Sequence, residues 1–174
     1  IKFNSEILIE KFLKEKNIIY SPKKICLIHL SSKWINKYYN ENNLLILIKN
    51  LTNKFNVILT TDETSEIKFK DIFLKFPIAQ NLEYPNYKLS DNVTIFKNLN
   101  FTNWISAIYS SSLIITPECG CTHIAGLCKI PSKIIYDADN YPHMINREYS
   151  PWRAKYEKFL FNENQLNFLL INNL

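Results

Sequence analysis

Short runs of apolar residues alternate along this chain with longer segments in which apolar residues recur every three or four positions. The runs have the length of strands and are mostly apolar throughout, as is typical of parallel strands buried on both faces. We expect strands over residues 25–30, 57–61, 93–96, 113–116 and 133–136. The segments with helical spacing predict helices over residues 5–16, 41–55, 62–76, 102–110, 120 to about 130, and 154–172, with an irregular stretch over 77–85.

The alternation of strands and helices predicts an α/β fold, a Rossmann-like, doubly wound parallel sheet built from right-handed strand–helix–strand units. In the common strand order 3-2-1-4-5, the strands at 25–30 and 113–116 are neighbours at the point where the order reverses. Ligands of such sheets bind there, outside the carboxyl ends of the strands. The loops that follow these two strands are therefore expected to face one crevice.

Three segments are expected: a linker and incoming helix over 1–22, a Rossmann-like domain over 23–153, and a C-terminal helix over 154–174 that packs back on the domain. The chain begins with Ile1 rather than Met, which favours a domain of a longer protein. No apolar stretch reaches the ~18 residues that span a bilayer, and no signal-peptide pattern opens the chain. The expectation is a cytoplasmic, reducing location, with the four cysteines as thiols.

The formal net charge of +5 comes from 21 basic and 16 acidic residues that are interspersed along the chain. Because no run of like charges stands out, a nucleic-acid-binding stripe is not expected. A protein that works near anionic phosphate or an anionic membrane surface is consistent with this balance. Residues 149–158 carry aromatic and basic side chains that are one candidate for peripheral membrane contact, and a packed helix with a basic edge explains them equally well.

Both glycines of the chain, Gly120 and Gly126, lie in the segment 114–128. Glycine serves tight turns and close backbone approach to a ligand. The segment predicts a strand, a sharp turn and a helix whose N-terminal N–H groups favour an anion. Gly120 is expected to turn the backbone against a diphosphate, and Gly126 to let the helix pack closely on the sheet.

Polar side chains follow the first two predicted strands. The loop after residues 25–30 offers two hydroxyls and two ammonium groups, and a lysine there can neutralise a phosphate as a point charge. These groups belong to Ser31, Ser32, Lys33 and Lys37. Glu66 follows the second strand, where doubly wound domains often place an acid against ribose hydroxyls.

Four candidate metal ligands also crowd into the glycine segment, namely Cys119, Cys121, His123 and Cys128. Zinc sites usually draw pairs of ligands from separate elements. Helical geometry from residue 121 onward would turn Cys128 away from the others, so neither a metal nor another cofactor is expected. Cys128 is better explained as a small buried apolar residue.

Residues 118–125, Glu-Cys-Gly-Cys-Thr-His-Ile-Ala, resemble the Asp-Ser/Thr-Gly-x-x-His-x-Ala pattern of glycosyltransferase family 9, the ADP-heptose:lipopolysaccharide heptosyltransferases and their relatives. Upstream, residues 29–32 and 37–40 are similar to the family's Thr-Thr pair and its Lys-Arg-Trp-Pro segment. The resemblance covers roughly residues 20–160. The chain departs from the family at Glu118 (usually Asp), Cys119 (usually Ser or Thr) and Tyr39 (usually Trp).

The resemblance implies the C-terminal, donor-binding half of a two-domain GT-B enzyme. It implies an inverting, metal-independent transfer from an ADP-sugar to the lipopolysaccharide inner core, at the cytosolic face of the inner membrane of a bacterium. The acceptor site and the catalytic base would lie in a separate N-terminal half. The implied catalytic residue is Lys37, and the implied donor-binding residues are Ser31, Ser32, Lys37, Glu66, Glu118, Cys119, Gly120, Cys121 and His123.

Two other functions remain open from the sequence. One is a different GT-B or epimerase-like enzyme that uses a UDP-sugar or GDP-sugar. The other is a nucleotide-binding remnant without catalytic activity.

Overall fold

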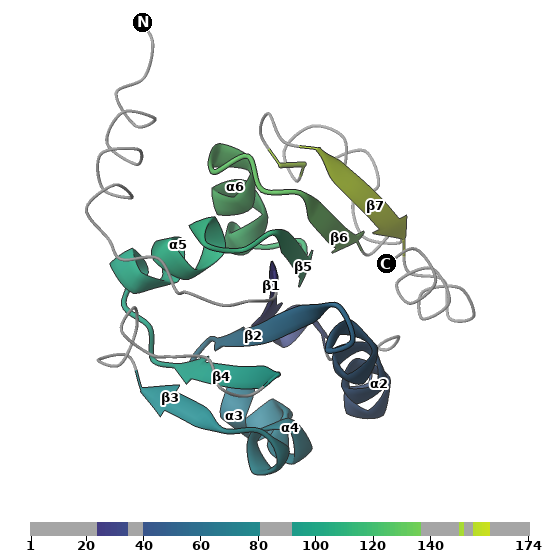
Figure 1. Cartoon of the computed structure of the whole chain (residues 1–174), viewed down its shortest axis with the longest axis vertical. Helices are drawn as coiled ribbons and strands as arrows, with labels where there is room; N and C mark the ends of the chain where they lie inside the picture. Colours follow the sequence, from purple (N-terminus) through teal and green to yellow (C-terminus); the bar gives the residue numbers. More distant parts are fainter. Residues whose placement is uncertain (1–23, 35–39, 81–91, 137–149, 152–154, 161–174) are drawn as a thin grey trace, which may run out of the picture.

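A single seven-stranded sheet, parallel throughout, forms the centre of the molecule (Figure 1). The computed structural model describes residues 24–34, 40–80, 92–136, 150–151 and 155–160. The strands are β1 (Lys24–Leu30), β2 (Phe55–Thr61), β3 (Ile78–Gln80), β4 (Val93–Lys97), β5 (Leu113–Pro117), β6 (Ser132–Tyr136) and β7 (Tyr156–Leu160). The helices of the described residues are η1 (Ser32–Trp34), α2 (Glu41–Leu51), α3 (Ser65–Lys68), α4 (Lys70–Lys75), α5 (Phe101–Tyr109) and α6 (Gly120–Leu127).

The strand order is β3-β4-β2-β1-β5-β6-β7. It contains the predicted order of five strands, with one further strand added at each edge, so the Rossmann-like α/β prediction is confirmed. Strand β1 pairs with β2 on one side and with β5 on the other. The order therefore reverses between β1 and β5, as the sequence predicted.

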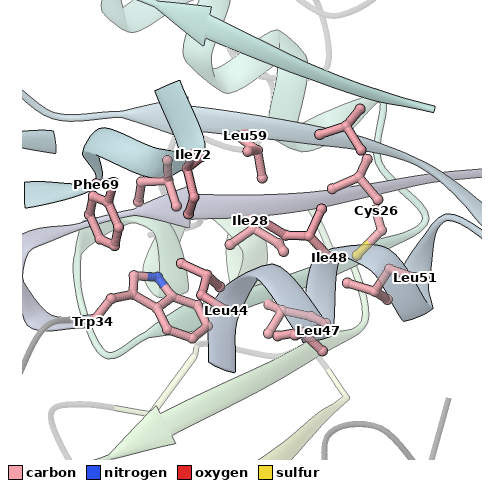
Figure 2. Close-up of a cluster of buried hydrophobic side chains, with 14 of the residues drawn as sticks. Cys26, Ile28, Trp34, Leu44, Leu47, Ile48, Leu51, Leu59, Phe69 and Ile72 are labelled. Carbon is pink, nitrogen blue, oxygen red and sulfur yellow. The ribbon is translucent and has the colours of Figure 1, made fainter. Parts of the chain in front are cut away.

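The sheet is buried on both faces because its apolar strands supply both cores. In β1, Cys26, Ile28 and Leu30 point into one core, while Ile25 and Leu27 point into the other. Figure 1 shows α2, α3 and α4 on one side of the sheet and α5 and α6 on the other. Figure 2 shows the first core, in which Leu44, Leu47, Ile48 and Leu51 of α2 meet the sheet and Trp34 of η1.

Local sequence explains where two of these helices begin. Asn40 precedes α2 and accepts a hydrogen bond from the backbone N–H of Asn43 at 2.9 Å. Asn100 does the same for Asn103 at the start of α5, at 2.8 Å. Each asparagine satisfies an N–H that has no partner within the helix.

The helix predicted over 62–76 is interrupted. Phe69, with backbone angles outside the helical region, separates α3 from α4, and its side chain is completely buried. The stretch 77–85, expected to be irregular, contains the edge strand β3. The predicted helix over 5–16 lies outside the described residues.

The prediction of a C-terminal helix from residue 154 is wrong over residues 156–160, which form β7 beside β6. Tyr156 packs with Ile134 and Tyr136, whereas Phe159 belongs to the first core on the opposite face of the sheet. Residues three apart share a face in a helix but lie on opposite faces in a strand. The pairing also covers what would otherwise be an open edge at β6. The remainder of 154–174 lies outside the described residues, and the segment boundaries at 22 and 153 stay predictions.

An ion pair joins the last two strands. The Nζ atom of Lys133 in β6 lies 2.9 Å from the Glu157 carboxylate of β7 and 5.4 Å from the centre of the Phe159 ring. The Lys133 side chain is only 4% exposed, whereas Glu157 is 60% exposed. A buried ammonium group needs such partners.

Within the described residues, no helix combines the length and the apolar character required to cross a bilayer.

Glu157→Gln is expected to lower the free energy of unfolding by about 1–2 kcal/mol, because it removes a negative charge from beside a buried ammonium group. Urea unfolding monitored by circular dichroism measures the change. Glu63→Gln is the matched control, since Glu63 is exposed and lies far along the chain from β7. Equal effects of the two substitutions would contradict the role of Glu157.

Candidate functional site

The loops after β1 and β5 meet at the carboxyl ends of these two neighbouring strands. The first loop begins at Ser31 and continues into η1, and the second is the short turn from Pro117 to the start of α6 at Gly120. An ion pair bridges them, with 2.5 Å between Nζ of Lys33 and the Glu118 carboxylate. Polar groups from both loops therefore meet where the strand order reverses, which is where the sequence predicted a ligand crevice.

The Lys33–Glu118 ion pair is partly accessible to solvent. The Lys33 side chain is 50% exposed and Glu118 is 21% exposed. The backbone N–H of Glu118 donates to the carbonyl of Ile135 in β6 at 3.0 Å, which holds the turn against the sheet. An exposed ion pair of this kind adds little to stability, so a polar ligand can compete for Lys33 at small cost.

Cys119 caps the N-terminus of α6. Its backbone N–H donates to the Thr122 hydroxyl at 3.4 Å, and its sulfur lies 3.3 Å from the Thr116 hydroxyl. The thiol also accepts from the backbone of the first helical turn. Burial raises the pKa of Cys119 above its ordinary value, so the thiol stays protonated. Sulfur is a weak acceptor, and the first helical turn is therefore less fully satisfied than an oxygen cap would leave it.

Gly120 is the first residue of α6, and its backbone conformation does not require a glycine, because its φ is not positive. A Cβ built on Gly120 would lie 3.9 Å from the Cη2 atom of Trp104, which is ordinary contact. The turn before α6 therefore needs no special backbone angle at residue 120, and the role of Gly120 against a diphosphate stays a prediction. Gly126 is buried in α6, consistent with close packing of this helix.

Cys121 and His123 lie in the first turns of α6. The Cys121 side chain is fully buried in the second core, and burial raises the pKa of this thiol well above its ordinary value. Only the backbone N–H of Cys121 is thus placed to serve a ligand. The His123 side chain is partly buried.

The cysteines of this segment form no disulfide. Cys119, Cys121 and Cys128 are free thiols, as is Cys26 in β1. Among the residues that the structure describes, no group of three or more His, Cys, Asp and Glu side chains is arranged to hold a metal ion.

The Ser31 side chain is buried, and its hydroxyl accepts a hydrogen bond from the backbone N–H of Lys33 at 3.1 Å. Ser32 opens η1, and Lys37 lies outside the described residues. The ammonium group that meets the β5–α6 turn therefore belongs to Lys33. The sequence had presented Lys33 and Lys37 together in one loop, and spacing alone did not separate them.

Glu66 lies in α3, beyond the end of β2, and its carboxylate forms an ion pair with Lys97 at the end of β4. The start of α3 is attached to β1, because the Ser65 hydroxyl donates to the carbonyl of Leu30 at 2.5 Å. Glu66 thus lies on the same edge of the sheet as Lys33 and Glu118. No contact joins Glu66 to either of them among the described interactions.

His29 and Trp104 form part of this edge that the sequence did not assign to the site. Their ring centres are 5.3 Å apart, and Nδ1 of His29 lies 3.0 Å from the Thr60 hydroxyl. Burial lowers the pKa of His29 to about 4, against the opposing effect of the Asp62 charge. His29 is therefore neutral at pH 7 and serves as a packing residue at the strand end.

Comparison with known proteins bears on the fold. No protein-family model and no curated protein sequence matches the chain. Among solved structures, a glycosyl transferase family 9 protein from Veillonella parvula matches with a TM-score of 0.61 and 10% identity over 92% of this chain and 41% of that one. The E. coli heptosyltransferase WaaC, solved with ADP-2-deoxy-2-fluoro heptose, matches with a TM-score of 0.62 and 12% identity over 95% of this chain and 46% of that one.

A UDP-GlcNAc 2-epimerase from Methanocaldococcus jannaschii, solved with UDP-GlcNAc and UDP, matches with a TM-score of 0.56 and 14% identity over 98% of this chain and 44% of that one. The chain thus spans less than half the length of each of these structures. Their similarity shows that the fold is the Rossmann-like fold found in GT-B glycosyltransferases. At such low identities, it does not by itself assign a reaction.

The low pKa of His29 predicts a pH-dependent stability. Below about pH 6.5 the unfolded chain binds a proton at His29, whereas the folded protein resists it until about pH 4. The unfolded state therefore binds more protons in this window. The free energy of unfolding should fall, by up to about 3 kcal/mol, as the pH drops through it.

Denaturant unfolding of the wild type and of His29→Asn across this window measures the effect. The difference in free energy of unfolding between the wild type and His29→Asn should change with pH across this window. A wild-type-to-variant difference that is independent of pH would refute the assignment to His29.

Proposed function

We propose that this chain is the donor-binding domain of a glycosyltransferase that uses an ADP-sugar. The observation that carries the proposal is the meeting of Lys33, Glu118 and the N-terminus of α6 where the strand order reverses. A cation beside a helix N-terminus that is only weakly capped, here by a thiol and a long 3.4 Å hydrogen bond, is suited to a diphosphate. The similarity in fold to family 9 glycosyltransferases supports a sugar nucleotide as the ligand.

In the proposed complex, the diphosphate takes the place of Glu118 beside Lys33. The backbone N–H groups of residues 119–121 donate to the phosphate oxygens, with the Cys119 N–H exchanging its long bond to the Thr122 hydroxyl for one of them. These donors do not depend on the identity of the side chains. Ser31 and Ser32 supply further hydrogen bonds from the facing loop. The Glu118 carboxylate, once released from Lys33, is free to accept hydrogen bonds from hydroxyl groups of the sugar.

Glu66 is the proposed partner of the ribose. A carboxylate accepts hydrogen bonds from two adjacent hydroxyls, as acids after the second strand do in other doubly wound domains. Its ion pair with Lys97 holds the side chain at the sheet edge before the nucleotide binds.

The proposed reaction is an inverting displacement at the anomeric carbon without a metal. Lys37 and the N-terminus of α6 would stabilise the negative charge that develops on the departing ADP, which is electrostatic stabilisation by groups already in position. The attacking acceptor, proposed to be the lipopolysaccharide inner core, and the catalytic base would be provided by a second domain. We place this reaction at the cytoplasmic face of the inner membrane of a bacterium.

A UDP-sugar enzyme is the second candidate. It is favoured by the similarity to the UDP-GlcNAc 2-epimerase, which extends over nearly the whole of this chain. Both candidates place a diphosphate at the same loops, and they differ in the base that is bound.

Calorimetric titration with ADP, UDP and GDP tests the donor class. ADP is expected to bind most tightly, and Lys37→Ala to weaken ADP by about 1–3 kcal/mol, the scale of a hydrogen bond to a charged group. Lys129→Ala, an exposed lysine after α6, is the control and should leave ADP binding unchanged. Preferential binding of UDP would favour the second candidate, and no binding of any nucleotide by folded protein would overturn both.

Substitutions of the Lys33–Glu118 pair test the anion site separately. Glu118→Gln removes a negative charge from the phosphate position and frees Lys33, so ADP should bind about threefold to tenfold more tightly. Lys33→Gln should weaken ADP by a similar factor. Calorimetry of both variants and of the double variant measures these effects, and weaker ADP binding by Glu118→Gln would contradict the proposed arrangement.

A further inference from the structure

A cavity of about 580 Å³ lies on the edge of the sheet opposite the candidate donor site. It opens between the second half of α2, the junction of α4 with β3, and the start of β4 at Val93. The candidate site lies at the other ends of the strands, where β4 finishes at Lys97 beside Glu66. The volume is within the range of sites that bind small organic molecules.

The floor of the cavity is apolar. Ile48 and Val93 are buried members of the first core, and Leu45 and Phe76 pack against that core. Pro77 extends this apolar wall toward β3. Such a floor offers few hydrogen bonds to a sugar or a nucleotide, and it gains free energy when it is covered by hydrocarbon.

Two lysines provide the charge of the cavity. Lys49 of α2 and Lys75 of α4 both line it and both are exposed, and none of the described residues that line it with them is acidic. Neither lysine forms an ion pair with an acid among the described residues. Ile46, which is 50% exposed, adds an apolar group to the same lining.

We propose that this cavity binds the acyl chain of a single-chain anionic amphiphile, such as a long-chain fatty acid. The hydrocarbon chain lies on Leu45, Ile48 and Val93, and the anionic head group pairs with Lys49 and Lys75. The charge complementarity selects an acid over a neutral lipid, because the two ammonium groups of the described lining favour a negative head group. This inference is independent of the proposed donor site.

Calorimetric titration of the 174-residue chain with dodecanoate, in monomeric form, tests the proposal against dodecanol as the neutral probe. Dodecanoate is expected to bind with one molecule per chain and about tenfold more tightly than dodecanol. The double substitution Lys49→Gln/Lys75→Gln should remove that preference. Lys68→Gln/Lys129→Gln, which changes the net charge equally outside the cavity, should preserve it.

Ile46→Ser tests the apolar lining and should weaken dodecanoate about threefold to tenfold. Ile67→Ser, at a more exposed isoleucine outside the cavity, is its control and should have no effect. Sedimentation with phosphatidylglycerol vesicles distinguishes a bilayer source of the acyl chain from a free acid. One-to-one binding of dodecanoate that depends on Lys49, Lys75 and Ile46 supports the proposal. Binding to the vesicles alone, no dependence on these residues, or no binding at all overturns it.

Thermal unfolding confirms that each variant is folded. Titration with ADP separates this proposal from the proposed function, because the cavity variants leave Lys33 and Glu118 unchanged. Loss of dodecanoate binding with unaltered ADP binding would assign the two ligands to separate sites.

Discussion

Burial of β1 from both sides is the constraint on which the rest of the molecule depends. Its side chains alternate between two cores, with Cys26 and Ile28 toward α2 and Ile25 and Leu27 toward α5 and α6. A strand in this position must be apolar on both faces and must have a hydrogen-bonded neighbour on each edge. Since β2 and β5 are those neighbours, the chain has to leave β1 in one direction and return to it from the other.

This arrangement leaves different side chains exposed at the two ends of the strands. At the carboxyl ends, the loops after β1 and β5 cannot pack inside the sheet, and Lys33 and Glu118 meet there in a partly exposed ion pair. At the amino ends, the gap between α2 and α4 is lined by apolar side chains with lysines among them. One sheet thus presents two chemically different surfaces, a polar loop pair at one end and an apolar cavity at the other.

The strands that the sequence predicted are those whose residues are apolar without interruption, because only burial on both faces explains such runs. The two missed strands are at the edges. In β7, the spacing of Tyr156, Phe159 and Leu160 suits a helix as well as a strand. Hydrogen-bonded pairing with β6 makes this segment a strand rather than a helix, and the ion pair between Lys133 and Glu157 joins the two paired strands. The break at Phe69 was missed for a similar reason, since its burial depends on contacts distant in sequence.

By itself, the sequence determined the fold class and the positions of the five inner strands, because hydrophobic burial is recorded locally in residue type and period. Their order was assumed from the common order of such folds, and the structure has it. Only the tertiary structure decided that Lys33 meets Glu118, that the Cys121 side chain faces the core, and that Gly120 needs no special backbone angle. These facts depend on side-chain directions across elements up to 85 residues apart in the chain. Spacing along a sequence carries no record of such directions, and packing of the two cores sets them.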